Sequence, residues 1–233
     1  MALSTIDNLQ VLFEDNHLIA INKRPSDIVQ GDKTGDTPLS EVVKLWLKKK
    51  YNKPGNVFVG VAHRIDRPVS GVVVFAKTSK ALARLNELFK SKEVSKTYLA
   101  AVCAMPPHQE DTVSHYMIKD GAKNRSKVVS EKNKTAKKAE LDYRLIGESD
   151  RYFFLEVKPK SGRHHQIRVQ LSAMGCVIKG DLKYGAPRSN KDASIHLHAR
   201  EISFIHPVSK EKLTVIAPVP DEPVWNVIAK LVD

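Results

Sequence analysis

The chain has 233 residues, of which 42% are hydrophobic, and this is enough to bury one sizeable core or two small ones. Lysine and arginine total 38 against 26 acidic residues, so the formal net charge of +12 favours a polyanionic partner, either nucleic acid or an anionic membrane surface. No apolar run approaches the roughly 18 residues that span a bilayer, and the first ten residues lack the basic start and apolar core of a signal peptide, so we expect a cytoplasmic protein.

The first half of the chain contains clear strand and helix patterns. Residues 11–23 predict a hairpin of two apolar runs joined by a Glu-Asp-Asn turn. Residues 39–50 predict a helix that Ser40 can cap and that ends in three lysines. Residues 78–91 predict a second helix with a Thr/Ser cap, and residues 96–103 predict a strand.

The second half begins with a segment of different character. Residues 105–138 show little periodicity, two prolines and a dense basic section, so we expect an extended or weakly ordered excursion. Residues 139–160 predict two further strands. Residues 161–175 predict a short helix that contains Arg168 and that Gly175 ends. The tail of the chain predicts a closing antiparallel pair.

These elements indicate the fold class. Strands, helices and hairpins are mixed without the regular alternation of a doubly wound fold. We therefore predict an α+β fold with a mixed, mostly antiparallel central sheet flanked by helices. No internal repeat or linker divides the sequence, which predicts a single domain over residues 1–233.

Several common chemistries lack their sequence requirements. The chain has no dinucleotide-binding or ATP-binding glycine loop and no His-Glu-x-x-His pair. Its two cysteines, Cys103 and Cys176, are far apart in sequence. His196 and His198 share one strand face without an acidic or cysteine partner nearby, so a hydrogen-bonded structural role is favoured over a metal site. We expect no metal and no cofactor.

One carboxylate stands among cations. Asp66 lies between Arg64 and Arg67 in the stretch "VAHRIDRPVSGVVVFAK" at residues 61–77, and His63 is one step further out. Cationic neighbours favour the ionised carboxylate, which suits nucleophilic or electrostatic work better than the role of a general acid. The composition of this stretch equally allows a turn aspartate that arginines neutralise.

Three motifs resemble one enzyme family. "HRIDRPVSGVVVFAK" resembles the "HRLDRxTSG" signature of the RluA branch of pseudouridine synthases, which isomerise uridine in RNA. "SKTYLA" and "SGRHHQIRVQLSAMGCVIKGDLKYG" resemble two further motifs in the same order, and the resemblance runs from about residue 10 to residue 220. The S4-type RNA-binding module that some RluA/RsuA-type enzymes carry has no room before residue 11, so we expect the bare catalytic domain.

Three departures from the family pattern concern substrate contacts rather than the chemistry. The chain has "NKRPSD" where the branch commonly has "NKPxG". Val69 replaces the usual threonine of the first motif, and His164 occupies a position that is often threonine or serine.

The resemblance implies a reaction and a catalytic trio. The family cleaves the bond from ribose C1′ to uracil N1, turns the base and rejoins it through C5, which requires no metal, redox partner or group donor. Asp66 would be the essential carboxylate, and whether it attacks the uracil ring, attacks the sugar or assists by charge stays open. Arg168 would pair with Asp66 and keep it ionised. Tyr98 would stack on the uracil and help to move the C5 proton.

The resemblance also implies substrate contacts, because the target nucleotide must be flipped out of stacked RNA into a pocket. Six residues are expected to contact the substrate: His63, Arg64, Arg67, Arg163, His165 and Gln166. Four lysines are expected to attract the RNA backbone, with an ordinary solvated face as the alternative: Lys132, Lys134, Lys137 and Lys138.

The sequence therefore predicts a monomeric pseudouridine synthase that acts on structured ribosomal or transfer RNA and binds neither metal nor membrane. The alternative is a catalytically silent RNA-binding or ribosome-assembly factor with the same fold. The intact trio of Asp66, Tyr98 and Arg168 favours the enzyme, because a binding protein would need no such trio.

Overall fold

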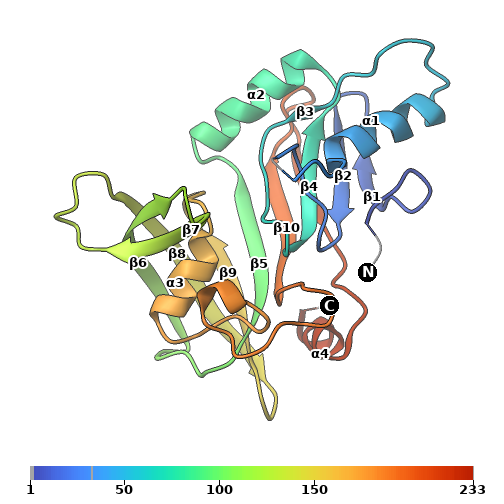
Figure 1. Cartoon of the computed structure of the whole chain (residues 1–233). Helices are drawn as coiled ribbons and strands as arrows, with labels where there is room; N and C mark the ends of the chain where they lie inside the picture. Colours follow the sequence, from blue (N-terminus) through green and yellow to red (C-terminus); the bar gives the residue numbers. More distant parts are fainter. Residues whose placement is uncertain (1–2, 33, 233) are drawn as a thin grey trace. The chain divides into compact units, whose positions relative to one another are not determined.

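The chain forms two compact units (Figure 1). The computed structural model describes residues 3–32 and 34–232. Unit 1 spans residues 1–96 and 199–218, and unit 2 spans residues 97–198 and 219–233. The boundary falls inside two strands, which each contribute residues to both units. The expectation that residues 1–233 act as one catalytic domain remains a prediction.

Unit 1 is built on an antiparallel sheet. Its elements are β1 (Val11–Glu14), β2 (Leu18–Lys23), α1 (Leu39–Lys50), β3 (Gly60–Val61), β4 (Ser70–Ala76), α2 (Ser79–Lys90), most of β10 (Leu197–Ile205) and β11 (Lys212–Ile216). The strand order is β1-β2-β4-β10, with β3 paired to β4 and β11 paired to β10. The predicted first hairpin and the predicted closing pair are both present, as β1–β2 and β10–β11.

Strand β4 is the centre of unit 1. All seven of its residues are buried, because the uninterrupted apolar run of this segment offers no polar face to water. Figure 1 shows β4 between β2 and β10. The loop that carries Asp66 leads directly into this strand, so the fold gives that loop a rigid base.

The two helices of unit 1 occupy the predicted segments. Helix α2 begins after Thr78, whose side chain accepts the N–H of Ala81 at 3.1 Å, as the sequence predicts. Helix α1 begins after Pro38, which has no side-chain cap, and Ser40 is its second residue. The predicted cap at Ser40 is therefore wrong, because the helix starts two residues earlier than a cap at Ser40 would require.

Unit 2 is built on antiparallel strands with helices. Its elements are most of β5 (Ser95–Val102), β6 (Glu110–Asp120), β7 (Arg125–Val129), β8 (Lys137–Glu148), β9 (Phe153–Pro159), α3 (Gln166–Ala173), the 3-10 turn η1 (Leu182–Tyr184) and α4 (Pro223–Val232). The strand order is β5-β9-β8-β6-β7, and each of these neighbouring pairs is antiparallel. Trp225 and Ile228 of α4 pack against Leu99, Ala101 and Phe154.

The structure corrects the expectation of a weakly ordered excursion at residues 105–138. This segment contains all of β6 and β7, which form a hairpin, and the start of β8. Only one face of these strands is buried, and Val113, Met117 and Ser126 occupy it. The same face also carries His115 and Lys119, so the apolar period-two pattern is weak in the sequence.

Helix α3 is shorter than predicted. Residues 161–165 form a loop, and His165 has a left-handed backbone with φ of 54°, so the regular helix starts only at Gln166. The helix ends at Met174 and Gly175 follows with φ of +81°, as the sequence predicts. Arg168 consequently lies in the first turn of α3.

The predicted α+β class with mostly antiparallel strands and flanking helices is confirmed. Within the described residues, no helix has the length and apolar character that crossing a membrane requires.

The backbone of Gly71 at the start of β4 allows a stability test. Its φ is +117°, and a Cβ atom here would lie 2.3 Å from the carbonyl oxygen of Ala199. We expect Gly71→Ala to lower the free energy of unfolding by about 3 kcal/mol or more, since strain and overlap with backbone add. Gly175→Ala is the control, because φ is also positive but a Cβ would meet nothing within 4 Å. It should cost about 1 kcal/mol. Equal losses in urea titrations would contradict this account of β4.

Candidate active site

In unit 1, Asp66 lies on the loop between β3 and β4. Its carbonyl oxygen accepts the N–H of Val69 at 3.0 Å and closes a turn that contains Pro68. The residue is half-buried. The loop therefore holds its carboxylate at the entry of a fully buried strand, where little of the backbone can move.

A buried lysine that the sequence analysis missed supports this loop. Lys23, at the end of β2, is only 1% exposed. Its ammonium donates to the carbonyl oxygens of Arg24 at 2.8 Å, Asp27 at 2.9 Å and Arg67 at 3.1 Å. The carbonyl of Arg67 also accepts the N–H of Ser26 at 2.9 Å. Lys23 thus fixes the backbone immediately after Asp66, and the only sequence signal was a lysine that ends an apolar strand.

Burial also changes the charge state of Lys23. Removal from water lowers the pKa of Lys23 to about 7, although the carboxylates of Asp27 and Asp66 favour its charged form. Lys23 contacts the Asp66 loop and loses its proton near neutral pH. The positive charge beside this loop therefore decreases as the pH rises through about 7.

His63 has a structural role in this loop. Its Nε2 atom accepts the N–H of Val74 at 2.9 Å, and its ring stacks on Phe89 with centroids 4.8 Å apart. Burial, with a smaller effect of Lys96, lowers the pKa of His63 to about 3. The imidazole is therefore neutral at physiological pH, and the expected contact of His63 with the substrate remains a prediction.

The two arginines beside Asp66 are exposed. Arg67 forms an ion pair of 2.7 Å with Asp36, and Nη1 of Arg64 lies 3.4 Å from Oε1 of Gln30. Both guanidinium groups are thus open to solvent at the rim of the loop, and their contact with RNA remains a prediction.

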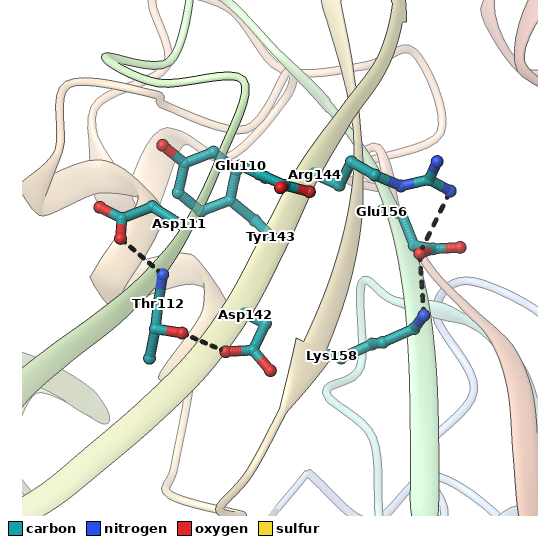
Figure 2. Close-up of a pocket in the computed structure, with 8 residues that line it drawn as sticks. All are labelled: Glu110, Asp111, Thr112, Asp142, Tyr143, Arg144, Glu156 and Lys158. Atoms are coloured by element: carbon teal, nitrogen blue, oxygen red, sulfur yellow. Dashed lines mark hydrogen bonds and ion pairs between the residues drawn. The ribbon is translucent and has the colours of Figure 1, made fainter.

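Unit 2 contains a surface pocket that is distinct from the predicted site. Figure 2 shows this pocket, which has a volume of about 450 Å³. It is lined by Glu110, Asp111, Thr112, Asp142, Tyr143, Arg144, Glu156 and Lys158. None of the predicted catalytic or substrate-binding residues is among them. Four carboxylates make this pocket unsuitable for RNA phosphate.

Arg168 in α3 is 4% exposed and forms a bidentate ion pair with Asp181. Its Nε donates to Oδ2 at 2.7 Å and its Nη2 to Oδ1 at 2.8 Å. A buried charge pair is stable only when such geometry offsets the loss of hydration. Asp181 was missed as a site residue, although it stands inside the third motif. The predicted pairing of Arg168 with Asp66 remains a prediction.

Tyr184 connects three parts of unit 2. Its hydroxyl accepts the N–H of Ser126 at 2.9 Å and hydrogen-bonds to Nδ1 of His165 at 2.8 Å. Its ring lies 5.1 Å from the guanidinium carbon of Arg168 and 5.1 Å from that of Arg125. His165, expected to contact substrate, is thus buried and bonded to a tyrosine that the sequence analysis did not select.

Gln166 holds the loop before α3. Its Oε1 accepts the hydroxyl of Ser161 at 2.7 Å and the N–H of Arg163 at 3.1 Å, and its Nε2 donates to the carbonyl of Glu140 at 2.9 Å. Both ends of the amide are therefore used within the protein. The expected contact of Gln166 with the substrate remains a prediction.

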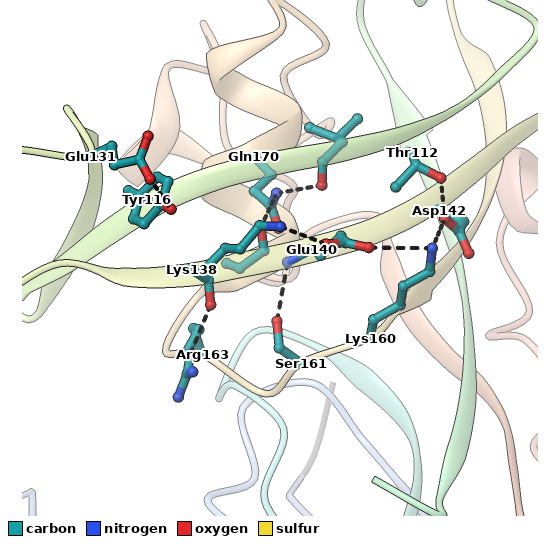
Figure 3. Close-up of polar contacts among 12 residues, drawn as sticks. Thr112, Tyr116, Glu131, Lys138, Glu140, Asp142, Lys160, Ser161, Arg163 and Gln170 are labelled. Atoms are coloured by element: carbon teal, nitrogen blue, oxygen red, sulfur yellow. Dashed lines mark hydrogen bonds and ion pairs between the residues drawn. The ribbon is translucent and has the colours of Figure 1, made fainter.

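Arg163 and Tyr98 are the remaining predicted site residues of unit 2. The side chain of Arg163 is exposed, and its Nε donates to the carbonyl of Lys138 at 3.3 Å (Figure 3). Tyr98 lies half-buried in β5, opposite Val157 of β9. Their contacts with RNA and with uracil remain predictions.

The predicted residues therefore fall into two groups. In unit 1, Lys23 joins the backbone beside Asp66 to β2. In unit 2, Arg168 and His165 meet at Tyr184. Among the described residues, no group of three or more histidine, cysteine or acidic side chains is arranged to hold a metal ion. His196 has a hydrogen-bonded role instead, since its Nε2 lies 2.6 Å from Oε2 of Glu222.

Comparison with known proteins identifies the family. The family model described as RNA pseudouridylate synthase matches residues 17–173. The ribosomal large subunit pseudouridine synthase C of Buchnera aphidicola subsp. Acyrthosiphon pisum is 33% identical over 219 residues, which cover 90% of this chain and 67% of that protein. The tRNA pseudouridine synthase C of Pectobacterium carotovorum subsp. carotovorum is 30% identical over 227 residues, 90% of this chain and 58% of that protein.

A solved structure gives the same result for the fold. Human RNA pseudouridylate synthase domain containing 4 superimposes with a TM-score of 0.79 at 23% sequence identity, covering 94% of this chain and 92% of that one. The chain belongs to the RNA pseudouridylate synthase family. It is an RNA pseudouridine synthase, an isomerase, as the resemblance predicted, and the alternative of a silent binding protein is not supported.

The low pKa of Lys23 predicts a pH dependence of stability. Between about pH 7 and pH 10.5 the folded chain holds less of this proton than the unfolded chain, so Lys23 makes the free energy of unfolding rise with pH. Lys23→Met should remove this rise, a change in slope of up to about 1.4 kcal/mol per pH unit. Denaturant titrations between pH 7 and pH 9.5 measure the slope. Lys49→Met, at an exposed lysine, is the control and should leave the slope unchanged. An unaltered slope in Lys23→Met would show that this lysine stays charged.

Proposed function

We propose that this enzyme converts uridine to pseudouridine in structured ribosomal or transfer RNA through Asp66. The observation that carries the proposal is the Asp66 loop, in which one carboxylate stands at the mouth of a buried strand above a buried lysine and beside two exposed arginines. Such a loop holds a charged group in a fixed orientation at the entry of a rigid strand. The names of the relatives, which cite ribosomal large subunit and tRNA substrates, support these two classes of RNA.

In this proposal the remaining residues have separate tasks. Asp66 acts on the flipped nucleotide while C1′–N1 breaks and C1′–C5 forms; the C5 proton leaves with Tyr98 assisting, and N1 takes up a proton from solvent, so that substrate and product are isomers. Arg168 keeps Asp66 ionised and aimed. Arg64, Arg67 and Arg163 hold the RNA around the flipped base. The enzyme works in the cytoplasm as a monomer. It needs no metal or cofactor, because the reaction is an internal rearrangement.

The first activity test removes the charge of Asp66. Asp66→Asn keeps the shape of the side chain, so tritium release from C5-labelled uridine in RNA should fall to background while RNA binding survives. Asp7→Asn is the matched control, since Asp7 is an exposed partner of Lys49 and should retain full activity. Substantial turnover by Asp66→Asn would refute the assignment of Asp66.

The second activity test concerns metal. Tritium release by the wild-type enzyme should continue at the same rate in excess EDTA and without any added nucleotide cofactor. Activity that disappears with EDTA and returns only with a divalent cation would contradict the proposed mechanism.

A further inference from the structure

Positive charge is concentrated at the end of the β6–β7 hairpin. Asp120 and Arg125 face each other as the last cross-strand pair, and a four-residue turn joins them. Five exposed cationic residues lie on or beside this end: Lys119, Lys123, Arg125, Lys127 and Lys183. Asp120 is the single acidic residue between positions 119 and 127.

The lysines of the outer sheet face in unit 2 differ from this group because they are paired. Lys138 lies 3.3 Å from Glu140, Lys160 lies 2.6 Å from Asp142, and Lys158 lies 3.0 Å from Glu156 (Figure 3 shows the first two pairs). Their carboxylate partners neutralise much of their field. Lys138, which the sequence analysis selected as an RNA-attracting residue, is therefore a weaker candidate than the hairpin end.

The two ends of β6 carry opposite charge. Glu110, its first residue, lines the acidic pocket of Figure 2, and Asp120, its last residue, enters the basic turn. The strand has 11 residues, which corresponds to a length of roughly 35 Å. An anionic partner would therefore be attracted to the turn and repelled from the opposite end of the same strand.

Side chains from the loop before α3 and from η1 fix the hairpin end. Nδ1 of His164 lies 2.9 Å from the hydroxyl of Ser126, and Nε2 of His164 lies 3.1 Å from Oδ1 of Asn124. The ammonium of Lys183 donates to the carbonyl of Asn124 at 3.0 Å. The turn is therefore held by three contacts rather than left as a mobile tip.

The same contacts bring the hairpin close to the predicted catalytic arginine. The guanidinium carbons of Arg125 and Arg168 each lie 5.1 Å from the ring centroid of Tyr184, so they are separated by no more than twice that distance. Arg125 is exposed, whereas Arg168 is buried and paired with Asp181. The hairpin thus places an exposed guanidinium, that of Arg125, within this distance of the buried guanidinium of Arg168.

We propose that the hairpin end, meaning Lys123, Arg125 and Lys183 as held by His164 and Tyr184, is a binding surface for the phosphates of the RNA substrate. Exposed lysine and arginine side chains with little acidic compensation bind phosphate and release counterions. Such contacts position an RNA without reading its sequence. This inference rests on the proposed function, and it names the part of unit 2 that holds the RNA backbone.

The test compares two triple variants that lose the same charge. Lys123→Gln, Arg125→Gln and Lys183→Gln together should weaken binding to an unmodified transfer RNA transcript and to an unmodified large-subunit ribosomal RNA fragment by roughly tenfold or more at physiological salt. The slope of log affinity against log salt should become shallower by about 2. The control combines Lys138→Gln, Lys158→Gln and Lys160→Gln, and it should change affinity and slope far less. Thermal melting of both variants verifies folding.

Two results would overturn the inference. One is a hairpin variant that binds both RNAs with wild-type affinity and slope. The other is a control variant that loses as much affinity as the hairpin variant, which would indicate diffuse attraction by net charge alone. Either result leaves the proposed function intact if the wild-type enzyme forms pseudouridine and Asp66→Asn does not, so the two failures are distinguishable.

A second variant tests whether the geometry of the hairpin end matters. His164→Ala removes both bonds to the hairpin but no lysine or arginine. We expect KM for RNA to rise several-fold, with a smaller change in kcat. His115→Ala is the control, because His115 is also half-buried and lies on β6, where its Nδ1 is 3.4 Å from Nε2 of Gln170 in α3 rather than beside the turn. Equal effects of the two substitutions on KM would contradict a specific role of His164.

Discussion

The buried ion pair between Arg168 and Asp181 is the interaction on which the arrangement of unit 2 depends. Arginine cannot lose its proton in a protein, so a guanidinium that is 4% exposed requires a carboxylate with both oxygens engaged. This requirement ties η1, which follows Asp181, to the first turn of α3. Tyr184 is thereby brought to Ser126 and His165, and the hairpin is fixed as a consequence. Removal of Asp181 would take this bidentate partner from a buried guanidinium, which is more damaging than replacing both residues by apolar ones.

Unit 1 also buries a cation, the ammonium group of Lys23. Lys23 is as deeply buried as Arg168, but its ammonium is satisfied by three backbone carbonyls instead of one carboxylate. Because a lysine can lose its proton, burial lowers its pKa to about 7. The carbonyl of Arg67 is one of its acceptors, so the position of the residue after Asp66 depends on this ammonium. The carboxylate itself stays half-buried and available for chemistry.

The sequence predicted most elements and the family, and its errors have clear physical causes. Apolar periodicity located β1, β2, α1, α2 and β5, because burial of one face leaves a direct trace in composition. The β6–β7 hairpin was missed, because residues such as His115 and Ser126 lie on its inner face and give no strong apolar signal. Short motifs identified Asp66, but they could not reveal whether a polar side chain is already used within the protein.

His63 and Gln166 differ from the arginines near them, because their side chains are already used for hydrogen bonds within the protein. His63 accepts a backbone N–H of β4, and Gln166 uses both ends of its amide in the loop before α3. Only three-dimensional structure shows such bonds, because partners such as Val74 and Glu140 carry no motif of their own. Residues in one motif therefore divide into those that hold the loop and those that remain exposed, such as Arg64 and Arg163.

His164 shows how a departure from the family pattern acquires a physical meaning. Its two ring nitrogens reach Ser126 and Asn124 at the same time. A threonine or serine, which often stands at this position in the family, has a single oxygen on a short side chain and could not bridge both residues. The imidazole also stacks on His165 with centroids 3.8 Å apart, which restricts its rotation. His164 therefore fixes the position of the basic turn in this chain, and in the proposal made above this position bears on RNA binding rather than on the bond-breaking step.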